Sequence, residues 1–78
     1  MPTALRVGSY RFFFRARDGD EPAHVHIERE AHVAKVWLDP VAVQNSGGFR
    51  RDELNRILRI VEENQERLLE SWNGFFKD

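Results

Sequence analysis

Cysteine is absent from the 78 residues of this sequence. This absence excludes a disulfide framework, a thiolate metal site and a cysteine nucleophile. A domain of this length buries only about 60% of the surface that its unfolded chain exposes, so its small core must be closed by packing alone or with help from a partner. We therefore expect a single domain over residues 1–78 that gains stability from a partner protein or from homo-oligomerisation.

Long hydrophobic runs and a strong charge of one sign are also lacking. No apolar stretch approaches the roughly 18 residues that a membrane span needs, and the first ten residues lack the apolar segment of a signal peptide. We therefore expect a cytoplasmic protein that has no membrane partner. Lysine and arginine number 12, aspartate and glutamate 13, for a formal charge of −1. This balance excludes a strongly basic nucleic-acid binder, although a local basic face remains open.

The two halves of the chain differ in the spacing of their apolar residues. Residues 4–45 are rich in β-branched and aromatic residues and are broken by turn-forming residues, which predicts strands. Residues 50–73 carry apolar residues at steps of three and four, which predicts a helix with one apolar stripe. We expect an α+β fold in which an antiparallel sheet of three to five strands is covered on one face by one long C-terminal helix.

Alternation inside the predicted strands separates an apolar face from a polar face. Residues 10–17 place aromatic side chains on one side and arginines on the other, with Phe13 as an apolar exception on the charged side. Residues 23–28 and 33–38 follow as a hairpin, and shorter strands are expected near residues 5–7 and 41–43. The register that buries the aliphatic residues of the hairpin sets a polar group on the other, exposed face. That group is His24, His26, Glu28, Lys35 and Trp37, with Arg11, Arg15 and Arg17 beside the histidines.

The spacing of His24 and His26 carries the clearest chemical signal. Residues two apart on a strand point to the same side, as an acid/base pair or two metal ligands require. A catalytic zinc site usually takes three protein ligands, and the third would be Glu28, His32 or an acidic residue of the turn at 18–21. Alternatively, both histidines hydrogen-bond to turn carboxylates or carbonyls and only fix the hairpin.

Basic and aromatic residues are interleaved on the same predicted face. Such a surface can contact a phosphate backbone and stack bases, as sheet-faced RNA binders do. Acidic residues close by can neutralise it, in which case the arginines are ordinary solvated strand residues. The basic and aromatic residues are Arg11, Arg15, Arg17, Lys35, Phe13 and Trp37, and the acidic ones are Asp18, Asp20, Glu21 and Glu28.

Several motifs, in this order, resemble one family of small bacterial proteins. They are Arg6 to Phe14, Gly19 to His26, Ala34 to Pro40, Gly48-Phe49 ahead of Glu53-Leu54, Glu62 to Asn64, and Trp72-Asn73. Together they resemble the proteins catalogued as domain of unknown function 4160, over almost the whole chain. The resemblance implies no established activity. It implies a gene pair with a second small protein, similar to a toxin–antitoxin module.

Two segments depart from the family pattern. Residues 29–32 stand where the family has a glycine-rich turn, and Arg50 stands where it has a serine helix cap. The first departure makes the hairpin loop bulkier, and the second weakens the start of the helix, because arginine offers no side-chain acceptor to the first amides. Neither departure touches His24, His26 or Lys35.

Taken with this resemblance, the exposed histidine pair predicts a toxin-like component of a bacterial two-protein module that acts on RNA. One histidine would act as general base on a ribose 2′-hydroxyl and the other as acid, while Lys35 with an arginine stabilises the phosphorane charge, without a metal or other cofactor. The predicted catalytic residues are His24, His26 and Lys35, and the predicted substrate-binding residues are Arg15, Arg17 and Trp37. The predicted partners are a small cognate protein and RNA.

Two other classes of function remain open. A non-catalytic interaction module would dock a partner on the same exposed face or on a sheet edge. A small metal-binding protein would use His24, His26 and Glu28 as its ligands.

Overall fold

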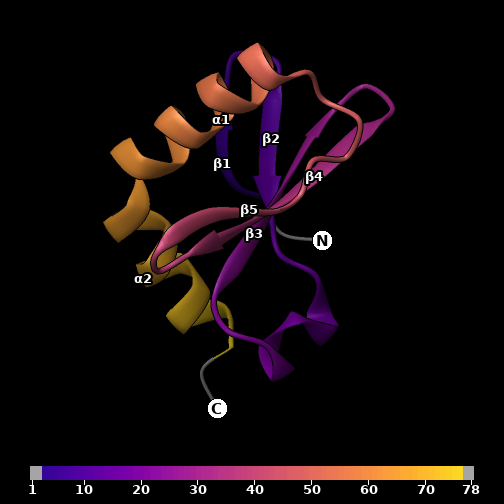
Figure 1. Cartoon of the computed structure of the whole chain (residues 1–78). Coiled ribbons are helices and arrows are strands. Elements are labelled where there is room, and N and C mark those ends of the chain that lie inside the picture. Colours follow the sequence, from indigo (N-terminus) through magenta and orange to yellow (C-terminus); the bar gives the residue numbers. More distant parts are fainter. Residues whose placement is uncertain (1–2, 77–78) are drawn as a thin grey trace.

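The part of the chain that the structure describes forms five strands, one short 3-10 helix and two α-helices (Figure 1). The computed structural model describes residues 3–76. In chain order the elements are β1 (Thr3–Val7), β2 (Tyr10–Phe13), η1 (Ala16–Asp20), β3 (His24–Arg29), β4 (His32–Leu38), β5 (Val41–Asn45), α1 (Arg51–Glu63) and α2 (Gln65–Phe75).

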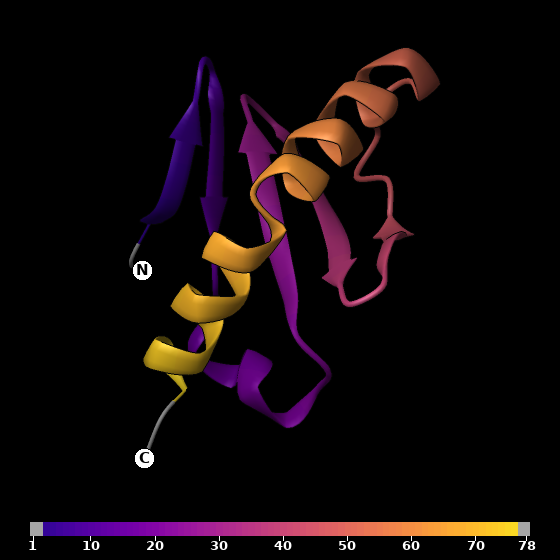
Figure 2. The same ribbon diagram turned by 90° about the vertical axis from the view of Figure 1, so that its left-hand side faces the viewer.

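The strands form one antiparallel meander in the order β1-β2-β3-β4-β5. Both α-helices cross the same face of this sheet, and η1 lies at its lower end, near the end of α2 (Figure 2). The predicted α+β fold with an antiparallel sheet is therefore confirmed, with five strands. Among the described residues, the helices are too short or too polar to cross a membrane.

The predicted register of the central strands is confirmed. Ile27 lies opposite Phe12 and Ala34, and Val25 lies opposite Val36. These five side chains are fully buried, because the helices lay their apolar stripe across this face. The helix residues of this core are Ile57, Val61, Leu68 and Trp72.

The prediction of one long helix is wrong, because the helical path breaks at Asn64. The backbone of Asn64 leaves helical geometry with φ −117° and ψ 17°, and its side-chain Nδ2 donates to the carbonyl of Ile60. Asparagine favours such local bonds at helix ends over a helix interior. Gln65 then donates to the backbone oxygen of Leu38 at 2.7 Å, which anchors the start of α2 to the end of β4.

The predicted strand over residues 10–17 is also wrong in its second half. β2 ends at Phe13, and η1 begins at Ala16. The carboxylate of Asp18 accepts the backbone N–H of Arg15 at 2.8 Å, and the N–H of Asp18 donates back to the Arg15 carbonyl at 3.0 Å. This reciprocal pair closes a tight turn that competes with strand pairing, so Arg15 and Arg17 do not continue the face of β2.

Candidate functional site

Asp18, His24 and His26 form a buried polar cluster where η1 meets β3. His26 Nε2 lies 2.9 Å from Asp18 Oδ2, and His24 Nε2 lies 3.2 Å from Asp18 Oδ1. The exposed fractions are 7% for Asp18, 0% for His24 and 5% for His26. One carboxylate from η1 thus faces two imidazoles from β3.

Aromatic rings wall this cluster. Phe13 of β2 stacks on His26 with ring centroids 5.4 Å apart. His24 lies between Trp37 of β4, at 5.6 Å, and Trp72 of α2, at 5.2 Å. The apolar walls exclude water from the two imidazoles, so the hydrogen-bonding needs of the rings fall on protein groups.

The hydrogen bond of His24 fixes which of its nitrogens carries a proton. His24 Nδ1 lies 2.9 Å from the backbone oxygen of Pro22. A carbonyl oxygen only accepts, so Nδ1 must be the donor. A neutral His24 therefore points the lone pair of Nε2 at Asp18.

The charge states of Asp18 and His26 follow from their surroundings. Burial raises the pKa of Asp18, but the N–H of Arg15 and the charge of nearby imidazoles outweigh it and lower that pKa overall. Burial lowers the pKa of His26, the Arg15 charge adds to this effect, and Asp18 opposes it without reversing it. At neutral pH an ionised Asp18 therefore accepts the Nε2 proton of a neutral His26.

The prediction that the histidine pair lies exposed on the sheet face is wrong, since both rings are buried. The cause is the early end of β2, which lets η1 fold over this part of the face and set Asp18 against both rings. Lys35 lies opposite His26 in the register, but its amine donates to Glu21 Oε1. The alternative in which turn groups hold the two histidines is therefore present in part. The Asp18 carboxylate contacts both rings, and the Pro22 carbonyl accepts from His24.

Glu28 lies outside the cluster. Glu28 shares β3 with the histidines, but its Oε1 accepts from Arg11 Nη1 of β2 at 2.8 Å, so its carboxylate is engaged by the neighbouring strand. Among the described residues, the side chains placed to share a metal ion with the two histidines include Asp18. The predicted ligand set with Glu28 is therefore corrected to one with Asp18.

The sheet face turned away from the helices carries the other predicted site residues. The guanidinium carbons of Arg11 and Arg15 lie 4.5 and 5.7 Å from the centre of the Phe13 ring. The amine of Lys35 lies 5.1 Å from the centre of the Trp37 ring. We call the open face the surface made by Arg11, Phe13, Lys35 and Trp37 of the sheet together with Arg15, which follows the end of β2 and reaches the Phe13 ring. Arg17 lies on η1, where it is exposed.

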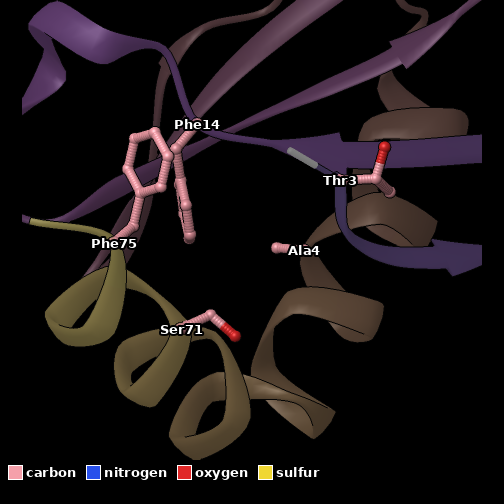
Figure 3. A pocket seen from close by; sticks show the side chains of 5 residues that line it. All are labelled: Thr3, Ala4, Phe14, Ser71 and Phe75. Carbon is pink, nitrogen blue, oxygen red and sulfur yellow. The ribbon is translucent and has the colours of Figure 1, made fainter. Parts of the chain in front are cut away.

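A separate pocket of about 290 Å³ opens between β1 and α2 (Figure 3). Its lining is mostly apolar and comes from Thr3 and Ala4 of β1, Phe14, and Ser71 and Phe75 of α2. None of the histidines or basic residues predicted to act on RNA lines it. The pocket therefore adds nothing to the predicted chemistry of the histidines.

The sequence analysis did not predict that Asp18 lies at the centre of the cluster, and it assigned Trp72 no role in the site. It weighed Asp18 only as one of several acidic residues near a metal. The signal that could have found the cluster is Phe13, because an aromatic residue on a charged strand face indicates that something covers that face. Trp72 carried no such signal, since its place on the helix stripe explains it fully.

Comparisons with known proteins agree with the resemblance noted in the sequence. No curated protein and no solved structure matches the chain. The family described as domain of unknown function (DUF4160) matches residues 9–73, which span the sheet from β2, the cluster and nearly all of both helices. The chain therefore belongs to the DUF4160 family.

Proposed function

We propose that this protein is the toxin-like component of a bacterial two-protein module and that it acts by binding single-stranded RNA on its open face. The support for the module is the family resemblance. The support for RNA as the ligand is one structural observation: two cation–aromatic groups lie on β2 and β4, the two strands that flank β3, on the sheet face turned away from the α-helices.

The chemistry of the open face suits unpaired nucleotides. Arginine and lysine contact phosphates, and aromatic or guanidinium planes stack on exposed bases whatever their sequence. Trp37 is half-buried and Arg15 is exposed, so both have surface to offer. Aromatic residues on a sheet surface stack two or three unpaired bases in known sheet-faced RNA binders.

Two ion pairs limit the strength of this interaction. Arg11 is bonded to Glu28, and Lys35 to Glu21. If RNA displaces both carboxylates, three cations contact phosphate and log Kd changes with log salt at a slope of about 2; if Arg15 alone contacts phosphate, the slope is about 0.7. The first slope corresponds to about 15-fold weaker binding between 50 and 200 mM salt, the second to about threefold.

Burial of the histidines favours binding over cleavage. A general base must come within hydrogen-bond reach of the 2′-hydroxyl, and His24 is fully enclosed while His26 is held by Asp18. RNA cleavage would therefore require η1 to move away from β3.

A partner protein docked on the same face is the second candidate. The two ion pairs leave the open face close to neutral, and tryptophan and arginine are enriched at protein–protein hot spots. The partner would be the small protein that the family resemblance places beside this one.

Fluorescence anisotropy with a labelled single-stranded RNA of mixed sequence tests the proposal. We expect Trp37→Ala to weaken binding at least about fivefold, the loss of one stacked base, and Arg15→Gln to lower the salt slope by about 0.7. Arg59→Gln is the matched control, because Arg59 is equally exposed but lies on α1. Equal affinity of all four proteins, or no binding at micromolar concentration, contradicts RNA as the ligand.

The module itself is tested in cells. Expression without the neighbouring small protein should slow growth, co-expression should restore it, and Trp37→Ala with Arg15→Gln should remove the effect. If the double variant stays toxic but no longer binds the neighbouring protein, the open face docks that protein instead of RNA. Cleaved cellular RNA would point to an enzyme, and unchanged growth with every variant would reject the toxin-like role.

A further inference from the structure

The buried cluster contains one nitrogen whose hydrogen bonding is incomplete. Within residues 3–76, His24 Nε2 has no hydrogen-bond partner, although it lies 3.2 Å from Asp18 Oδ1. The distance is short enough for an ion pair, but the directions of the two groups do not form a hydrogen bond. Burying such a nitrogen without a partner is costly.

The contacts that His24 and Asp18 make with other groups show why these two residues do not hydrogen-bond to each other. The backbone oxygen of Pro22 accepts a hydrogen bond from His24 Nδ1–H, so Nε2 of a neutral ring holds a lone pair. Asp18 Oδ2 already accepts from His26 Nε2 and from the Arg15 N–H. Asp18 Oδ1 and His24 Nε2 are thus two acceptors that face each other. A positively charged species between these two atoms would satisfy both.

We infer that Asp18, His24 and His26 bind a divalent transition-metal ion, with Zn²⁺ as the best-fitting candidate. Two imidazoles and one carboxylate are the nitrogen and oxygen ligands that Zn²⁺ takes when cysteine is absent. This inference does not rest on RNA binding, because none of the three ligand residues belongs to the open face.

The distances fit such an ion. Two ligand atoms that each lie about 2.1 Å from a tetrahedral ion are separated by roughly 3.4 Å, and in an octahedral site by roughly 3 Å. The carboxylate–imidazole separations are 2.9 Å from Asp18 Oδ2 to His26 and 3.2 Å from Asp18 Oδ1 to His24. One ligand atom from each of the three residues lies within 4.8 Å of the other two.

The surroundings of the ligands fit as well. A metal-bound histidine usually donates its other N–H to a carbonyl or carboxylate, which orients the ring. His24 Nδ1 makes that bond to Pro22. The apolar rings of Phe13, Trp37 and Trp72 close the shell around the histidines, and a dry shell strengthens the attraction between ion and carboxylate.

Bound Zn²⁺ would join η1 to β3. Asp18 comes from η1, and both histidines come from β3, so the ion would hold the segment that covers this part of the sheet. To bind the ion, a neutral His26 must offer the lone pair of Nε2, so its single ring proton moves from Nε2 to Nδ1. The ion then replaces that proton as the positive species between imidazole and carboxylate.

Titration of metal-free protein with ZnCl2 tests the inference by calorimetry and thermal melting. We expect one ion per chain and a rise in Tm of roughly 10 °C or more at a hundredfold excess over Kd. Co²⁺ should give the visible absorption bands of a protein-bound ion. Asp18→Asn, which keeps the size of the side chain, should weaken Zn²⁺ binding at least about tenfold.

His32→Gln provides the matched control. His32 is the remaining histidine of the chain, is exposed, and bonds only to the carbonyl of Gly47 among the described residues. This variant should bind Zn²⁺ as the wild type does. Should Asp18→Asn fail to fold, the ring signals of His24 and His26 in NMR spectra of the wild type must shift on adding Zn²⁺ while those of His32 stay unchanged.

Several results would overturn the inference. They are no Tm shift and no Co²⁺ bands with wild-type protein, loss of binding in His32→Gln, or shifts confined to the His32 signals.

Discussion

Alternate residues of β3 are buried to the same degree by different means. Val25 and Ile27 are 0% exposed and lie under the two helices, while His24 and His26 are 0% and 5% exposed on the other face. A broad apolar stripe covers the first pair. A five-residue 3-10 helix with one carboxylate covers the second, helped by aromatic rings. Full burial on both faces of a strand therefore does not require an apolar residue at every position.

The apolar side of this comparison should give the largest effect. Ile27→Ala leaves a cavity beneath the helices, and we expect it to lower the free energy of unfolding by about 2–5 kcal/mol. Thermal melting should show a fall in Tm of at least about 8 °C for a domain of this size. Val43→Ala is the control, since Val43 is 37% exposed on the edge strand β5, and it should change stability by less than about 0.5 kcal/mol. A loss below about 1 kcal/mol for Ile27→Ala would contradict the assigned core.

The polar side should give the next largest effect. In metal-free protein, Asp18→Ala removes the acceptor of His26 Nε2 and of the Arg15 N–H, and we expect a loss of about 1–3 kcal/mol. Asp20→Ala changes an exposed aspartate of the same 3-10 helix and should change stability by less than about 0.5 kcal/mol. Urea unfolding of the two variants checks the difference. Equal stability would mean that Asp18 is as dispensable as a surface residue.

The same contrast explains how far the sequence predicts the fold. Val25 and Ile27 alternate with polar residues, and that pattern is sufficient to set the register of β3 against its neighbours. The alternation also continues through Arg15 and Arg17, yet β2 ends at Phe13. Periodicity cannot detect this end, because it depends on a hydrogen bond between the Asp18 carboxylate and the backbone of Arg15.

The helix break follows the same rule. The apolar stripe pauses between Val61 and Leu68, which are separated by six residues that include Asn64. The gap and the asparagine were visible in the sequence, but helical spacing on both sides of them predicts one continuous helix. The break also depends on the bond from Gln65 to Leu38, a contact across 27 positions that local pattern does not reveal.

The candidate site was predicted in its residues more than in its environment. Period-two spacing correctly brought His24 and His26 to one side of β3. Their burial comes from Asp18 of η1 and from Trp72. These two residues lie 6 and 48 positions away from His24 in the sequence. Contacts of that kind depend on tertiary packing, so an exposed pair was the natural expectation from the strand alone.

A polar contact on the helix-covered face provides the smallest test of the comparison. Tyr10 is 5% exposed, and its hydroxyl donates to Glu53 Oε2 at 2.8 Å, with Arg29 Nε 3.2 Å from the same oxygen. The Tyr10 hydroxyl and its partners lie at the margin of the apolar core. They do not bury the neighbouring residues, as Asp18 and η1 do for the histidines. We expect Tyr10→Phe to cost about 1 kcal/mol at neutral pH, less than Asp18→Ala.

The pH dependence of Tyr10 checks this contact directly. Burial raises the pKa of Tyr10 above 10.0, and the hydrogen bond to Glu53 raises it further. The folded state thus keeps the phenolic proton at pH values where the unfolded state loses it, so this contribution to stability is complete below pH 10 and is lost as pH rises above it. Tyr10 is the single tyrosine of the chain, and the ultraviolet absorbance of tyrosinate therefore reports it alone. We expect a midpoint above 10 in folded protein and a midpoint near 10 in urea, whereas a midpoint near 10 in both would show that Tyr10 is neither buried nor bonded to Glu53.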